Sequence, residues 1–145
     1  MRFLILLIPL LFLSCNSNSV SSANDDSSKS KSEDEFKMYE VSEMAALMEQ
    51  MYVENKRLKE HIIENDTLGK FPIYFLNIEK ATLTKGKDRD AFFTKHADEF
   101  ISKQMEIYTA KDTTKAFNAM VDACIKCHEV KCGGPIPKIK KLYIK

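Results

Sequence analysis

Apolar residues recur every three or four positions over much of the chain, which is the spacing of one face of an α-helix. The first such run extends from residue 41 to residue 62, with Glu and Lys side chains on its other side. Ser42 suits the start of this helix as a cap, and Asn65 with Gly69 suits its end. Its inner face is predicted to hold Val41, Met44, Met48, Met51, Asn55, Leu58 and Ile62.

Three further helices are predicted, over about residues 72–83, 88–110 and 112–132, the last ended by the Gly133-Gly134-Pro135 sequence. Short connections between helices favour antiparallel neighbours, so the chain is expected to form an all-α, antiparallel four-helix bundle. The final ten residues are basic but also apolar, and this tail is expected to pack back on the bundle through Ile136, Ile139, Leu142 and Ile144.

Composition agrees with a single small helical domain. The chain has 145 residues, of which 44% are hydrophobic and 30% charged, with four Gly, four Pro and no Trp. This balance is typical of a globular domain, and the scarcity of turn residues disfavours an all-β fold. The formal net charge of +1 gives no basic excess, so nucleic acid is not an expected partner.

The first residues have the layout of an export signal. One Arg precedes an apolar run too short to span a bilayer, which predicts a signal peptide over residues 1–14. The following Cys15 resembles the lipidated cysteine of bacterial lipoproteins, which implies a lipid anchor to a bacterial membrane and a periplasmic location. Residues 15–37 are rich in Ser and Asn and predict a flexible tether, followed by a folded domain over residues 38–145.

The sequence "CIKCHEVKCGGP" near the C-terminus carries the clearest chemistry. Cys124, Cys127 and His128 form a Cys-x-x-Cys-His motif, the attachment signature of c-type haem. The two thiols add to the haem vinyl groups, and the histidine binds the iron from one side. Because the vinyl groups and iron belong to one rigid ring, all three side chains must project from about one helical turn. Phe117 and Val121 continue the same helical face.

Other chemistries remain open for these cysteines. Zinc would require Cys124, Cys127 and Cys132 with either His128 or His96, and an iron–sulfur centre would use the same thiols. The cysteines could also form a disulfide or a redox-active pair, although redox pairs of this spacing usually begin a helix after a strand. Cys132 has no assigned role.

A haem motif on the last helix of a four-helix bundle resembles the class II cytochromes c, a group that includes cytochrome c′. The resemblance implies one covalent haem c, with Cys124 and Cys127 as thioether residues and His128 as the proximal iron ligand. It also implies either electron transfer, with a methionine from the first helix as the second iron ligand, or gas binding at an open iron. Met48 is the preferred ligand, followed by Met51 and Met44, and Leu47, Phe117 and Val121 are expected around the haem.

We therefore predict a membrane-tethered electron carrier that exchanges electrons with redox partner proteins and is not itself an enzyme. The alternatives are a five-coordinate gas-binding or sensing protein and a zinc-stabilised structural lipoprotein. His96 is interpreted as a partly exposed residue with one hydrogen bond, and His61 as a surface residue. The basic residues of the tail are candidates for docking to an acidic partner: Lys138, Lys140, Lys141 and Lys145.

Overall fold

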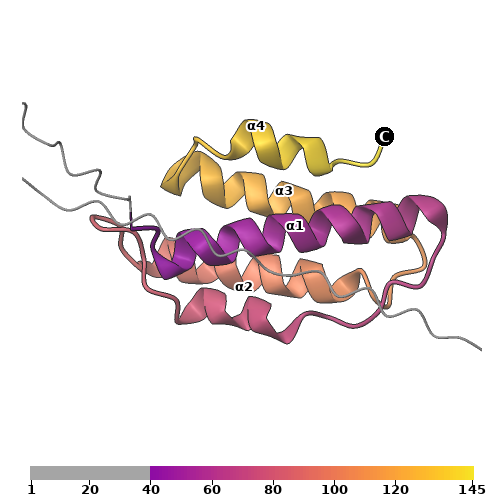
Figure 1. The fold of residues 1–145 in the computed structure, drawn as a ribbon, viewed down its shortest axis with the longest axis horizontal. Coiled ribbons are helices and arrows are strands. Elements are labelled where there is room, and N and C mark those ends of the chain that lie inside the picture. The colour runs from indigo at the N-terminus through magenta and orange to yellow at the C-terminus, as the bar shows by residue number, and fades with distance from the viewer. Residues whose placement is uncertain (1–39) are drawn as a thin grey trace, which may run out of the picture. The chain divides into compact units, whose positions relative to one another are not determined.

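The computed structural model describes residues 40–145, which form helices joined by short connections (Figure 1). The predicted signal peptide, Cys15 and the predicted tether lie outside the described residues. The described residues belong to one compact unit. Residues 40–145 contain helices and no strand, so the all-α prediction is confirmed for the part of the chain that is described.

Helix α1 spans Glu43–Glu64. The hydroxyl of Ser42 caps its start by accepting a hydrogen bond from the backbone N–H of Ala45, 3.2 Å away. Asn65 ends the helix in the left-handed conformation, with a φ of 54°. Both predicted caps are therefore confirmed. Val41 precedes the cap and is 58% exposed, so its predicted place on the inner face is wrong.

The second predicted helix is much shorter than expected. Only Ile73–Glu79 is helical, as the 3₁₀ helix η1. The chain beyond it is drawn to the start of α1, where the backbone carbonyl of Thr82 accepts a bond from the N–H of Met44 at 3.0 Å. The N–H of Thr82 in turn donates to the carboxylate of Glu43 at 2.8 Å. Backbone groups that a continuing helix would need are thus used by α1, which limits the second helix to η1.

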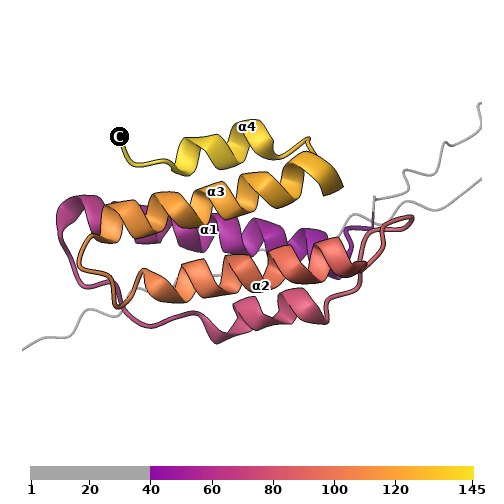
Figure 2. The same cartoon turned by 180° about the vertical axis from the view of Figure 1, so that it is seen from behind.

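Helices α2 and α3 lie side by side in both views (Figure 2). Helix α2 spans Ala91–Glu106 and α3 spans Thr113–Lys131, and each begins at a capping aspartate, Asp90 or Asp112. The prediction for α2 was a few residues too long at each end, whereas that for α3 was close. The ammonium of Lys131 lies 2.6 Å from the carboxylate of Asp90, so the end of α3 meets the start of α2.

The C-terminal tail packs back on the domain, as predicted. It forms the short helix α4, Ile136–Ile139, and the 3₁₀ turn η2, Lys140–Leu142. Ile139 and Leu142 are buried, and Ile136 and Ile144, which were also predicted to pack back, are partly buried. Lys59 of α1 fixes the tail by donating hydrogen bonds to two of its backbone carbonyls, at 2.9 and 2.7 Å.

The core lies among α1, α2 and α3 and is closed by η1 and the tail. Its apolar side chains follow the helical spacing of the sequence, which is why the helices bury these faces. The largest fully buried side chains are Phe75, Phe117, Ile107, Met120, Gln104 and Val121.

Candidate functional site

The three residues of the Cys-x-x-Cys-His motif line one cavity. Cys124, Cys127 and His128 lie in the last two turns of α3, where the helical backbone directs all three toward α1, α2 and the tail. Met48 of α1 lines the same cavity. The cavity has a volume of about 100 Å³ and opens to solvent, so it is smaller than most closed cofactor sites.

His128 is held in one orientation by its own helix end. Its Nδ1 atom lies 3.1 Å from the backbone carbonyl oxygen of Cys132. A carbonyl can only accept, so Nδ1 carries the hydrogen and Nε2 keeps a free lone pair. Burial lowers the pKa of His128 and favours this neutral form. A metal-binding histidine needs the same arrangement, with one nitrogen fixed by a second-shell acceptor and the other free for the metal.

The two motif cysteines are free thiols with raised pKa values. Burial raises the pKa of Cys124 to about 12, and burial also raises the pKa of Cys127. Both side chains are therefore protonated at neutral pH, which disfavours a role as thiolate nucleophiles. The thiol of Cys124 makes a weak contact with the sulfur of Met120, 3.7 Å away. Thioether formation requires only that both sulfurs reach the haem edge, and both line the cavity.

The three candidate methionines are placed differently. Met48 and Met51 both line the cavity, whereas Met44 is buried in the core and does not reach it. Met48 is partly exposed, and Met51 is only 4% exposed. The structure therefore retains Met48 and Met51 as candidates for a thioether ligand.

The predicted wall residues Leu47, Phe117 and Val121 do not line this cavity. All three are buried in the core instead. The apolar walls come from residues that sequence reasoning did not single out as pocket residues: Ile78, Phe93, Ala97, Phe100, Ala123, Pro135, Ile139 and Leu142. Their helical spacing indicates that most of them face inward, but it cannot tell which of them border a cavity rather than solid core.

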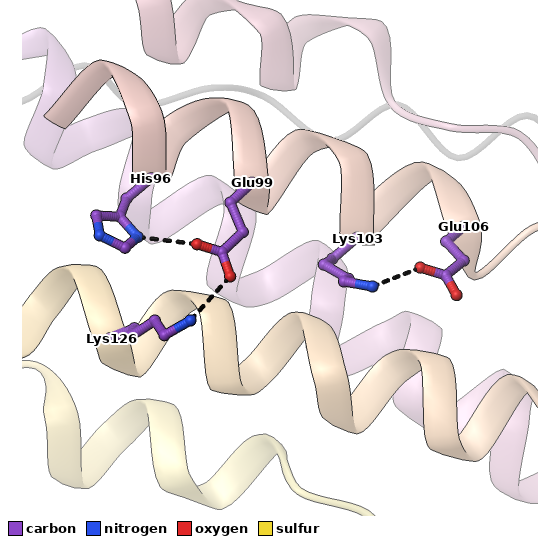
Figure 3. Close-up of polar contacts among 5 residues, drawn as sticks. All are labelled: His96, Glu99, Lys103, Glu106 and Lys126. Atoms are coloured by element: carbon purple, nitrogen blue, oxygen red, sulfur yellow. Dashed lines mark hydrogen bonds and ion pairs between the residues drawn. The ribbon is translucent and has the colours of Figure 1, made fainter. Parts of the chain in front are cut away.

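His96 also lines the cavity. Its contacts with Glu99 and Lys126 are drawn in Figure 3. It is buried, so its predicted partial exposure is wrong, although the predicted single hydrogen bond is present. Its Nδ1 donates to the carboxylate of Glu99, 3.0 Å away, and Glu99 also pairs with Lys126 at 3.1 Å. The hydrogen bond from Lys126 holds the pKa of Glu99 below its usual value. Glu99 therefore orients the His96 ring, as the backbone carbonyl of Cys132 orients His128.

The other two candidate residues lie outside the cavity. His61 is partly exposed near the end of α1 and lies 3.1 Å from the carboxylate of Asp66, as expected for a surface residue. Cys132 is exposed at the end of α3, and its sulfur lies 3.4 Å from Nδ1 of His128. Its backbone therefore has a positioning effect on His128 even though its thiol does not line the cavity.

The side chains of the described residues do not by themselves assemble a metal centre. Over residues 40–145, no group of three or more His, Cys, Asp and Glu side chains is arranged to hold one metal ion. The zinc set that includes Cys132 is thus not assembled there. Haem needs less from the chain, because its ring supplies four ligands to the iron and the protein supplies one or two. The orientation of His128 and the position of Cys124 and Cys127 fit this requirement.

One charged pair borders the cavity. Lys138 of α4 pairs with Glu49 of α1, and its ammonium lies 4.4 Å from the centre of the Tyr52 ring. Lys138 is therefore engaged within the domain, whereas Lys140, Lys141 and Lys145 are exposed.

Comparison with known proteins gives no relative. The sequence matches no protein-family model, no curated protein and no solved structure. Among the helices of residues 40–145, none has the length and apolar character needed to cross a membrane.

Proposed function

We propose that this protein is a monohaem c-type cytochrome that carries electrons and is tethered to a bacterial membrane. The observation that carries the proposal is the shared cavity: Cys124, Cys127 and an oriented His128 line it from one helix, and Met48 lines it from another. This set matches the needs of a covalent haem with a histidine and a thioether as iron ligands. The proposed family is the class II cytochromes c, with α1, η1, α2 and α3 as its antiparallel bundle.

The haem would supply the one-electron chemistry, and the chain would supply its setting. Cys124 and Cys127 would fix the ring, and the carbonyl of Cys132 would hold the imidazole of His128 in one tautomer. The aromatic walls from α2 and the apolar tail would exclude most water, which limits the reorganisation that accompanies a change of charge. A thioether from Met48 would favour the reduced state, because soft sulfur prefers the lower charge.

The proposed location and partners rest on the sequence. Lipidation of Cys15 would hold the domain at the periplasmic face of a membrane through the 15–37 tether. The exposed lysines 140, 141 and 145 would attract an acidic redox partner and raise the rate of encounter. Lys138 would contribute less, because it is already paired with Glu49.

The test is the visible spectrum of the full chain, expressed in a host that exports proteins and attaches haem c. We expect a haem band that persists after denaturation, and low-spin bands in both oxidation states. Cys124→Ala combined with Cys127→Ala should abolish the covalent haem. Cys132→Ala is the matched control, because it removes a nearby thiol but keeps the backbone carbonyl that binds His128.

Each other outcome supports a different function. A covalent haem that is high-spin in both oxidation states would indicate the five-coordinate gas-binding or sensing protein. A colourless protein that contains zinc would indicate the zinc-stabilised structural lipoprotein. A colourless protein without metal would contradict the proposal and leave the motif as free or disulfide-bonded cysteines.

A further inference from the structure

A second cavity lies between α1, α2 and the segment that leads into η1. We call it the amide cavity, because two buried carboxamide side chains, Asn55 and Gln104, line it. Its volume is about 120 Å³, and it opens to solvent. Leu58 and Phe75 form part of its apolar wall.

Both amides are buried without a satisfied hydrogen bond in the described part of the chain. Asn55 is 2% exposed, and its Oδ1 has no partner there. Gln104 is 0% exposed, and neither its oxygen nor its nitrogen has a partner of normal geometry. The hydroxyl of Tyr108 lies near Gln104, and its pKa is raised by burial and lowered, to a smaller extent, by Gln104. The hydroxyl is not placed to form a hydrogen bond with either amide atom of Gln104, so the amide stays without a partner there.

Buried polar atoms of this kind require an explanation. A buried acceptor with no partner destabilises the fold by about 1–3 kcal/mol, and native proteins satisfy nearly all such groups with protein atoms or ordered water. Two unsatisfied amides that line one cavity therefore indicate a shared partner inside it.

The chemistry of the two amides defines that partner. It must donate a hydrogen bond to Oδ1 of Asn55, and it must both donate to and accept from Gln104. The described charged groups that line the cavity belong to Glu54, Arg57, His61 and Lys70, which are at least partly exposed, so the amides favour a small neutral occupant. About 10–15 Å³ of cavity volume is enough for one water molecule, so a cavity of about 120 Å³ has room for several. We propose that the amide cavity holds ordered internal water bound by Asn55 and Gln104.

The water site has a consequence for the larger cavity, because Asn55 lines both. Water in the amide cavity keeps the polar atoms of Asn55 turned toward that cavity. The wall of the larger cavity that faces the motif cysteines therefore stays apolar. This consequence rests on the proposed haem function, whereas the water site itself does not.

A crystal structure of the full chain, at a resolution that resolves ordered water, tests the site directly. We expect water at about 2.7–3.2 Å from Oδ1 of Asn55 and from the amide of Gln104, both with and without haem. A dry cavity, a direct bond between the two amides, or an organic molecule in the cavity would each overturn the proposal. Because the water is expected in both forms, a colourless protein would refute the haem proposal without affecting this one.

A double-mutant cycle gives a second, independent readout. Asn55→Leu and Gln104→Met each remove one amide and leave the water with too few partners, so each should lower the folding equilibrium constant by about tenfold or more. Together they make the site apolar, so the combined loss should be much smaller than the product of the two single losses. Met120→Leu is the control, because it alters a buried residue that lines neither cavity. Single losses that simply multiply would show that the two amides share no water.

Discussion

The most informative perturbation is Met48→Ala, because it separates the contribution of Met48 to folding stability from its proposed role as an iron ligand. If the Met48 thioether is the second iron ligand, its removal leaves an open position. The oxidised and reduced haem should then change from low to high spin, and the reduced protein should gain carbon monoxide binding. The same change in Met51 should leave the haem low-spin.

For the free energy of unfolding, we expect the opposite order: Met51→Ala should have the larger effect and Met48→Ala the smaller. Met51 is 4% exposed, and truncation of a fully buried Met to Ala costs about 2–5 kcal/mol of unfolding free energy. Met48 is partly exposed, so less of its side chain leaves water on folding, and we expect a loss of about 1–2 kcal/mol. In the haem-free chain Met48→Ala should therefore be the milder variant, whereas in the haem protein it should have the larger spectral effect.

The assay pairs urea unfolding of the haem-free variants with visible spectra and carbon monoxide titration of the haem-containing ones. Met44→Ala serves as a control, because Met44 is buried but does not line the cavity. If Met48→Ala keeps a low-spin spectrum, Met48 does not bind the iron. If Met51→Ala instead changes the spin state, Met51 is the ligand. If neither variant changes the spin state, neither Met48 nor Met51 binds the iron.

Three further predictions concern the scaffold. Phe117 is 0% exposed, so Phe117→Ala should lower the unfolding free energy by about 3–5 kcal/mol, measured by urea denaturation, and a loss below 1 kcal/mol would contradict its core position. Ser42→Ala should cost about 1 kcal/mol and Ser42→Asp little, because only alanine removes the capping oxygen; equal losses in thermal melts would exclude that cap. The hydrogen bond from Lys131 holds the pKa of Asp90 below its usual value, so stability from this pair is present above about pH 4 and is lost as pH falls through the lowered pKa. Asp90→Asn should remove that acid-dependent part and match the original chain at low pH, and an unchanged pH profile would show that the pair contributes nothing.

Sequence periodicity located the helices well where local signals agree. Ser42 and Asn65 mark the ends of α1, and Asp112 marks the start of α3, because caps satisfy backbone groups within a few residues of themselves. The motif residues Cys124, Cys127 and His128 were also readable, because their spacing is a local property of one helix.

Predictions from local sequence signals were wrong where residues distant in the sequence bind the same backbone groups or set the packing. The residues around Thr82 read as helix, but their backbone groups bind the start of α1 instead. Leu47, Phe117 and Val121 have the spacing of an inward face, and they are buried, but they do not line the cavity that holds the motif residues. The sequence predicted partial exposure for His96, and this was wrong. Its burial depends on how α2 packs against the other helices, which helical spacing alone does not give.

By itself, the sequence determined that this domain is helical, that its tail packs back, and that the two cysteines and the histidine of the motif share about one turn. The helices and the motif depend on interactions over a few residues, and the packing of the tail follows from its apolar composition. Only the tertiary structure decided that Met48 and His96 share a cavity with His128, and that Asn55 and Gln104 line another. Those neighbours come from different helices, and their meeting depends on how whole faces pack, which no local pattern encodes.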